Sequence, residues 1–388
     1  MNRIFQYVIG GLFMAIAAIT VGHTDPKIQT VTTKNGITAW LVESHSIPMI
    51  SMEFSFRAGT AFEPANKSGV AAMLAGMMDE GAGDLDATAF QQAMEDIGAR
   101  FGAGADTLDF NVNLSTLTEN RHDAFKLLKL ALEKPRFDTD ALERIRDATM
   151  AGLRQEQENP SAVAARAFDT ALFGTHPYGR PVDGTLKSVP TLTQADVAAF
   201  YNTHMTKANM VVSVVGDITP AELQTVLDDV LGNLPAGTTR NAIAAAPKAI
   251  TPQVVKVERD IPQASVMFGH LGISRDDPLY FPALVLNDIL GGGGFRSRFM
   301  NEVREKRGLA YGAYSSFVPM PFAGTFVAQV QPKNDKVHES VAIMKEQMAL
   351  LATEGATKQE YDDAISYLTG SFPLRLDSNG KILGYLST

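Results

Sequence analysis

The chain repeats a short segment of its own sequence, and this repeat constrains the fold more than any other feature. Residues 47–54 read IPMISMEF and residues 261–268 read IPQASVMF, so both follow I-P-x-x-S-x-x-F at an offset of 214 residues. A Val-Glu pair lies upstream of each copy, at 42–43 and 257–258, and a helical apolar pattern ending in glycine lies downstream. The repeat predicts duplication of a folding unit of about 200 residues.

The duplication and a change in composition predict the domain boundaries. Residues 236–252 are rich in Ala, Thr and Pro, which is typical of an exposed linker. We therefore expect a first domain over 25–235 and a homologous second domain over 253–388. The strand predicted at 210–215 would have its copy beyond Thr388. The second domain is thus expected to be shorter or to lack a C-terminal tail, and we favour the missing tail.

Within each half, alternating apolar residues indicate strands and apolar residues at helical spacing indicate helices. Predicted strands cover 37–42, 50–56, 108–114, 210–215, 253–257, 265–270 and 324–331. Predicted helices cover 86–97, 121–132, 141–157, 220–230 and 337–351. Strand pairs followed by runs of helix favour an α+β fold, in which helices are layered on one face of each antiparallel sheet.

The N-terminus predicts the cellular location of the chain, and the amino-acid composition excludes several classes of function. A basic start (Met1-Asn2-Arg3) and an apolar stretch over 8–21 predict a signal peptide over 1–24 and a periplasmic location. An uncleaved N-terminal membrane tether is the alternative. The chain has no cysteine, which excludes disulfides, thiolate metal sites and cysteine nucleophiles. A net charge of −9 argues against nucleic-acid binding.

Several short motifs follow one another along the chain. They lie at 57–60 (RAGT), 63–64 (EP), 67–69 (KSG), 176–181 (HPYGRP), 209–212 (NMVV), 215–217 (VGD) and 304–311 (REKRGLAY). From about residue 30 to the end, the chain resembles the pitrilysin/insulinase-type (M16) metallopeptidases, which include the processing peptidases. The resemblance implies two homologous α+β domains that enclose a peptide chamber.

The zinc motif that this resemblance leads one to expect is lost. Active members carry H-x-x-E-H on the first helix after the KSG segment, where two His one turn apart hold Zn²⁺ and Glu activates water. Ala72, Ala75 and Gly76 stand at those three places, and Gly152 stands near the place of the third ligand, a downstream Glu. The seven histidines are scattered along the chain. We therefore expect no metal in this chain.

The second-domain motif, in contrast, is kept. In active relatives an Arg and a Tyr seven residues apart contact the substrate backbone and help to stabilise the oxyanion, and Arg304 and Tyr311 match that spacing. Gly308 is expected to end a helix, with a strand over 309–317 presenting Tyr311. The run Gly291, Gly292, Gly293 and Gly294 lacks the spacing of a phosphate-binding loop, so a flexible hinge or a peptide-contacting loop is expected there.

These features together predict a non-zinc subunit of a heterodimeric metallopeptidase. A partner that carries H-x-x-E-H would supply zinc and the general base, while this chain supplies Arg304 and Tyr311 to peptide or unfolded polypeptide substrates. The chain alone is then expected to be inactive. The alternative is a non-catalytic peptide-binding or scaffold protein of the same fold. Self-association into a homodimer when the partner is absent stays open.

Overall fold

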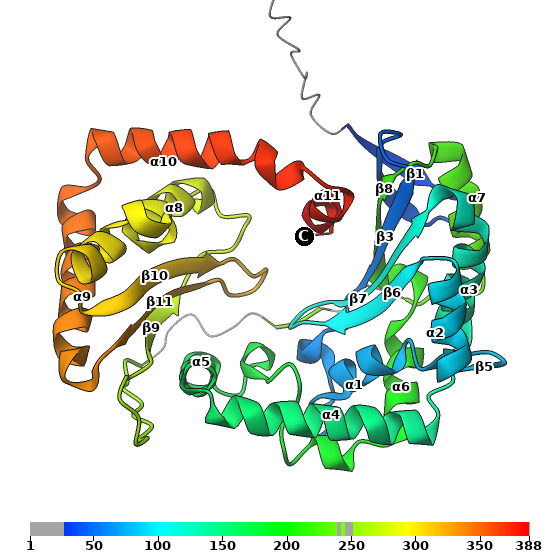
Figure 1. The fold of residues 1–388 in the computed structure, drawn as a ribbon, viewed down its shortest axis with the longest axis horizontal. Helices are drawn as coiled ribbons and strands as arrows, with labels where there is room; N and C mark the ends of the chain where they lie inside the picture. Colours follow the sequence, from blue (N-terminus) through cyan, green and yellow to red (C-terminus); the bar gives the residue numbers. More distant parts are fainter. Residues whose placement is uncertain (1–26, 239–241, 245–250, 388) are drawn as a thin grey trace, which may run out of the picture.

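The computed structural model describes residues 27–238, 242–244 and 251–387. These residues form two halves that stand side by side, each built on its own β-sheet (Figure 1). The predicted signal peptide and much of the predicted linker lie outside the described residues. No helix in the described part of the chain is both long enough and apolar enough to span a bilayer.

The first half contains a six-stranded sheet with the order β1-β2-β8-β3-β7-β6. The strands are β1 (Ile28–Thr32), β2 (Thr38–Glu43), β3 (Met49–Phe56), β6 (Arg100–Ala105), β7 (Phe110–Leu117) and β8 (Met210–Gly216). Neighbouring strands are antiparallel except for β2 and β8, which pair in parallel. The strands predicted at 37–42, 50–56, 108–114 and 210–215 are confirmed as β2, β3, β7 and β8, whereas β1 and β6 were not predicted.

Helices cover the outer face of this sheet and its lower end. They are α1 (Val70–Met77), α2 (Ala87–Asp96), α3 (Arg121–Glu133), α4 (Thr139–Glu158), α5 (Pro160–Phe173), α6 (Gln194–His204) and α7 (Pro220–Val230). Between α1 and α2, the short strands β4 (Gly81–Ala82) and β5 (Leu85–Asp86) form a hairpin. Helices α2, α3 and α7 lie on the outer face, α4 runs below the sheet, and α5 lies toward the second half (Figure 1). The core between sheet and helices includes fully buried Phe54, Phe56, Phe90 and Phe110.

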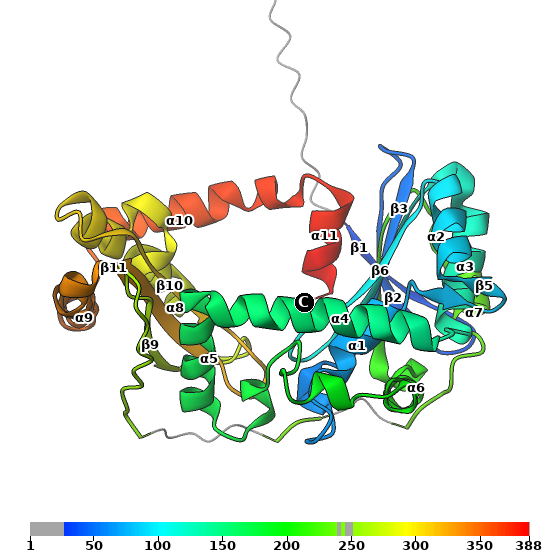
Figure 2. The ribbon, with the colours of Figure 1, turned by 60° about the horizontal axis from the view of Figure 1, so that its bottom comes forward.

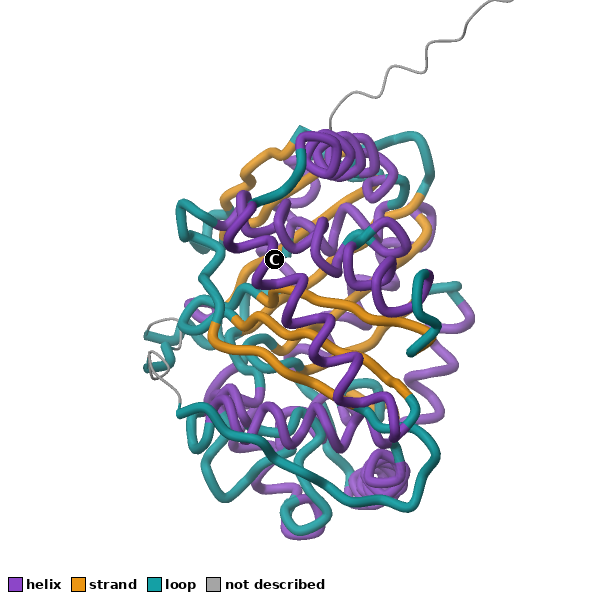
Figure 3. Tube along the Cα trace, turned by 90° about the vertical axis from the view of Figure 1, so that its left-hand side faces the viewer, coloured by secondary structure: helices purple, strands orange, loops and turns teal. Residues whose placement is uncertain are grey.

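The second half contains a three-stranded antiparallel sheet with the order β10-β11-β9. Its strands are β9 (Val266–Leu271), β10 (Ala310–Val318) and β11 (Thr325–Pro332), and its helices include α8 (Tyr280–Asn287), α9 (Val337–Glu354) and α10 (Lys358–Ser371). Viewed from this side of the molecule, helices lie in front of the strands (Figure 3). The predicted fold class, α+β with helices layered on sheets, is confirmed.

The strand predicted at 253–257 is wrong. These residues form no strand, and Val254, Val255 and Val257 are exposed. In the first half, β8 lies between β2 and β3 and bonds to both. Among the described residues no strand takes that place beside β9, so residues 253–257 have no pairing partner. They line a cavity of 1320 Å³ instead, together with β9, α5 and α9.

Each half sends one helix onto the sheet of the other. Helix α11 (Asn379–Leu386) buries Leu383 and Leu386 against Val42 and Val215 of the first sheet. Helix α5 of the first half lies against β9 of the second. Figure 2 shows α10 leading from the second half to α11, which stands beside the first sheet. This exchange joins the two halves through apolar contacts.

Candidate functional site

Helix α1 carries three of the four degenerate zinc-motif positions. Ala72 and Gly76 lie one turn apart and are half-buried, while Ala75 is buried. None of these residues has a side-chain N, O or S atom that could bind a metal. Gly152, on α4, is exposed and equally without a donor atom. No group of three His, Cys, Asp or Glu residues suited to a metal occurs in the described part of the chain.

The packing around Gly76 also disfavours a larger side chain at that position. A Cβ at Gly76 would lie 2.8 Å from Ile145 Cγ2 on α4, closer than side-chain carbons approach one another. A histidine at position 76 would therefore require Ile145 to move. The residues present do not fit the zinc ion that the resemblance implies, both because donors are absent and because α1 and α4 are packed against each other.

Glu63 holds the N-terminal end of α1. Its buried carboxylate accepts hydrogen bonds from the backbone N–H of Gly69, at 3.0 and 3.1 Å, and of Ala71, at 3.0 Å. Burial raises the pKa of Glu63 to about 7, although these N–H groups and the charge of Arg180 act to lower it. The carboxylate thus satisfies free backbone N–H groups at the start of α1, where the N-cap residue Gly69 has a left-handed φ of 95°.

Arg304 and Tyr311 contact each other in the second half. Arg304 Nη1 donates to the backbone carbonyl oxygen of Tyr311 at 3.0 Å, and the guanidinium carbon lies 4.3 Å from the centre of the Tyr311 ring. The same guanidinium lies 4.7 Å from the ring centre of Phe295, and Arg304 Nε is 3.3 Å from a carboxylate oxygen of Glu305. Tyr311 is 81% exposed, so its phenol is free to reach a ligand.

Glycines set the path of the chain into β10. Gly308 has a φ of 60° and donates its N–H to the carbonyl of Arg304 at 2.8 Å, which confirms that it ends the helical segment. Pairing with β11 then shifts between Ala310 and Ala313, at the point where Tyr311 lies. Such an irregularity locally re-aims a side chain. The turn at Gly308 and this shift together place Tyr311 beside Arg304.

The glycine run is packed rather than loose. A Cβ at Gly291, Gly292 or Gly293 would lie 2.5 to 2.6 Å from neighbouring backbone or side-chain atoms. Gly294 has a φ of 60°, which favours glycine for conformational reasons. Gly291 is buried beneath β10, while the other three are at least partly accessible. Close packing accounts for three of the glycines, and contact between this run and a peptide stays a prediction.

Comparison with known proteins places this arrangement in a family. The model of the insulinase family (peptidase family M16) matches residues 40–186, and that of the peptidase M16 inactive domain matches residues 191–368. A solved structure of a peptidase M16 inactive domain from Pseudomonas fluorescens is 35% identical, with a TM-score of 0.88 over 93% of this chain and 86% of that one. The chain belongs to the M16 peptidase family.

Curated relatives within the M16 family differ in what their names state. A non-peptidase homolog, YmxG of Helicobacter pylori, is 27% identical over 97% of this chain and 85% of its own length. An uncharacterized zinc protease of Mycobacterium leprae is 27% identical over 84% of this chain and 74% of its own length. Similarity to a non-peptidase M16 homolog agrees with the loss of donor atoms at positions 72, 75 and 76.

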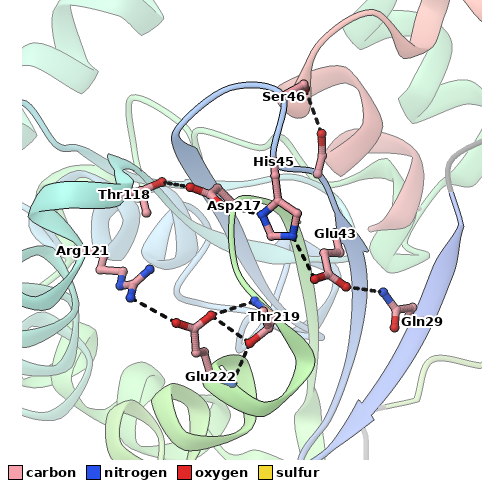
Figure 4. A network of polar contacts seen from close by, with 10 residues as sticks. Gln29, Glu43, His45, Ser46, Thr118, Arg121, Asp217, Thr219 and Glu222 are labelled. Atoms are coloured by element: carbon pink, nitrogen blue, oxygen red, sulfur yellow. Dashed lines mark hydrogen bonds and ion pairs between the residues drawn. The ribbon is translucent and has the colours of Figure 1, made fainter.

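A further polar cluster in this M16 chain was not predicted from the sequence. His45 lies between two carboxylates, with Nδ1 2.5 Å from Asp217 and Nε2 3.0 Å from Glu43, and Thr118 donates to Asp217 at 2.8 Å (Figure 4). Hydrogen bonds to Asp217 and Glu43 raise the pKa of His45. The cluster joins the loop after β2 to the end of β8, and we assign it a structural role. His45 and Asp217 are 172 residues apart, so no local pattern indicates the cluster.

Proposed function

We propose that the chain is the non-zinc subunit of a two-subunit M16 peptidase. One contrast carries the proposal: the zinc-motif positions hold no donor atoms, whereas Arg304 and Tyr311 remain paired with Tyr311 exposed. A chain that had only lost its peptidase activity would have no reason to keep the residues that contact substrate. A partner chain with H-x-x-E-H would supply the zinc and the general base.

Arg304 and Tyr311 have distinct roles in this proposal. Arg304 is held in place by the carbonyl and the ring of Tyr311, so its remaining N–H groups are oriented before a peptide binds. Those groups would donate to a carbonyl oxygen of the substrate backbone. The Tyr311 phenol would donate to the oxyanion that forms at the attacked carbonyl carbon, where a positioned donor stabilises the transition state more than the ground state.

A second function rests on a different observation. The similarity to a non-peptidase homolog favours a protein that holds peptides without contributing to their cleavage. Arg304 and Tyr311 would then bind peptide backbone, and no partner would depend on them for turnover. Under either function we propose that the chain acts in the periplasm on exported, unfolded polypeptide segments.

Hydrolysis of a mixed pool of quenched fluorescent peptides, with Zn²⁺ present, tests the proposal. The chain is assayed alone and after co-purification with an M16 chain that carries H-x-x-E-H. We expect cleavage only by the mixture, above the rate of the zinc-bearing chain alone, and inhibition by a chelator. Cleavage by this chain alone would refute the interpretation of residues 72, 75 and 76. Peptide binding with no gain in cleavage would support the second function.

A further inference from the structure

An exposed phenylalanine lies against the Arg304–Tyr311 pair. Phe295 is 65% exposed, and the Arg304 guanidinium lies over its ring at 4.7 Å from the centre. Because the guanidinium also lies over the Tyr311 ring, two exposed aromatic rings flank one arginine. Arg304 occupies one face of the Phe295 ring, and most of the remaining ring surface is in contact with water.

The loop that carries Phe295 is anchored on both sides of that residue. Arg296 Nη2 donates to both carboxylate oxygens of buried Asp288, at 2.8 and 2.7 Å, and its guanidinium lies 4.0 Å from the ring centre of Tyr367. On the other side, the carbonyl of Gly294 accepts from the hydroxyl of Ser297 at 2.8 Å. Phe295 is therefore held outward by a fixed backbone, so its exposure does not come from a loose loop.

Exposure of this side chain does not stabilise the fold, because the folded state is stabilised when a phenylalanine ring is buried away from water. A rigid, exposed aromatic side chain beside an oriented arginine is, however, typical of binding surfaces, where it loses little conformational entropy on binding. We infer that Phe295 sets the side-chain preference of the proposed peptide site, selecting an aromatic or large aliphatic residue next to the peptide bond that Arg304 contacts. The inference rests on the proposed function.

The charges beside the ring favour neither an acidic nor a basic peptide side chain. Arg304 Nε lies 3.3 Å from a carboxylate oxygen of half-exposed Glu305, so the two opposite charges largely balance each other. A small polar side chain would cover the Phe295 ring without burying apolar area of its own. A neutral, bulky apolar side chain buries its own surface and the ring together.

Binding of short labelled peptides to the full chain, measured by fluorescence anisotropy, tests this preference without any partner. The peptides share one alanine-rich sequence and differ at one central position, which is Phe, Leu, Ser or Asp. We expect roughly ten-fold tighter binding of the Phe and Leu peptides, in line with one side chain in an apolar contact. Phe295→Ala should abolish this difference and leave the Ser peptide unchanged.

Two control variants separate the effect from general damage. Phe281→Ala removes a phenylalanine of similar exposure (73%) from α8, away from Arg304 and Tyr311, and should leave the preference unchanged. Phe295→Tyr keeps the ring and should also keep the preference. All three variants should unfold at the temperature of the unaltered chain, because both side chains are mainly in water.

The outcomes distinguish this inference from the proposed function. If the unaltered chain binds no peptide, the proposed peptide site fails, and the inference fails with it. If the chain binds all four peptides equally, or if Phe295→Ala weakens all four by the same factor, only the role of Phe295 is refuted. If Phe295→Ala leaves peptide binding intact but dissociates the zinc-bearing partner, Phe295 is a subunit contact and the inference is wrong.

Discussion

Arg304 is held by two different parts of Tyr311. Its Nη1 donates to the backbone carbonyl oxygen of that residue at 3.0 Å, and its guanidinium lies 4.3 Å from the centre of the phenol ring. Both contacts use the planar shape of the guanidinium, one through a directed N–H group and the other through stacking. A lysine would keep the positive charge but has no planar group that could make both contacts at once. The geometry therefore makes position 304 specific for arginine.

Replacing Arg304 should lower turnover without affecting zinc. In a complex with the zinc-bearing partner, we expect Arg304→Ala to reduce kcat/KM by about 10²-fold, a typical loss for one oriented donor. Arg304→Lys should lose nearly as much. Metal content, measured by atomic absorption on the purified complex, should not change. Arg307→Ala is the matched control, because Arg307 pairs with Glu302 instead of with Tyr311. Equal turnover of all variants would rule out the proposed role of Arg304.

Replacing Tyr311 by Phe separates catalysis from binding. The change removes one hydroxyl from a side chain that is 81% exposed, so stability should not change. If the phenol donates to the oxyanion, kcat should fall by about 10² to 10³ while KM stays close to its original value. Steady-state kinetics of the complex measure both constants. A rise in KM at constant kcat would instead favour a role in holding the peptide.

Two glycines of the degenerate motif should respond to alanine in opposite directions. Gly76→Ala places a Cβ 2.8 Å from Ile145 Cγ2 and should lower the free energy of unfolding by about 1–3 kcal/mol. Gly152 lies at an exposed position inside helix α4, and no atom lies within 4 Å of a Cβ added there. Gly152→Ala should therefore stabilise the chain by about 0.4–1 kcal/mol.

Urea unfolding of both variants checks this contrast. Ile145→Ala alone would leave a gap, but combined with Gly76→Ala it should recover part of the loss, because the two side chains compete for one space. If Gly76→Ala were as stable as the unaltered chain, the α1–α4 contact would be looser than described, and the steric part of the argument against a histidine there would fail.

Sequence patterns predicted those features that depend on local spacing. A strand such as β7 is visible because Phe110, Val112 and Leu114 alternate with less buried residues. Loss of the zinc motif is visible because residues one helical turn apart share a face, so Ala72 and Gly76 can be judged from the sequence. The end of the helical segment at Gly308 and the strand that follows it are visible in the same way, from a glycine followed by apolar residues.

Features that depend on distant partners were not predictable. Residues 253–257 have the apolar character of a strand, but a strand also requires a neighbour, which the local sequence does not specify. The run of glycines indicated a flexible hinge or a peptide-contacting loop, and the close packing of Gly291 against Ser315 of β10 was not visible in the sequence. No sequence pattern indicates a role for Phe295, because the sequence does not distinguish an exposed phenylalanine from a buried one.

Glu63 should make the stability of the chain depend on pH. Burial raises its folded-state pKa from 4.5 to about 7, so the folded state binds the proton more tightly than the unfolded state. The resulting stabilisation is complete below pH 4.5 and is lost as the pH rises through 7. A shift of this size corresponds to about 3 kcal/mol. The free energy of unfolding in urea should thus fall between pH 5 and pH 8, and Glu63→Gln should reduce that fall.

A second glutamate provides the control for this experiment. Glu222 caps α7 through Thr219, and these hydrogen bonds lower its pKa. The contribution of Glu222 to stability is lost only in acid. Glu222→Gln should therefore leave the difference in the free energy of unfolding between pH 5 and pH 8 unchanged. If Glu63→Gln also left that difference unchanged, Glu63 would be ionised throughout this range. The backbone N–H groups of Gly69 and Ala71 would then outweigh the burial of the carboxylate, and α1 would begin at a permanent negative charge.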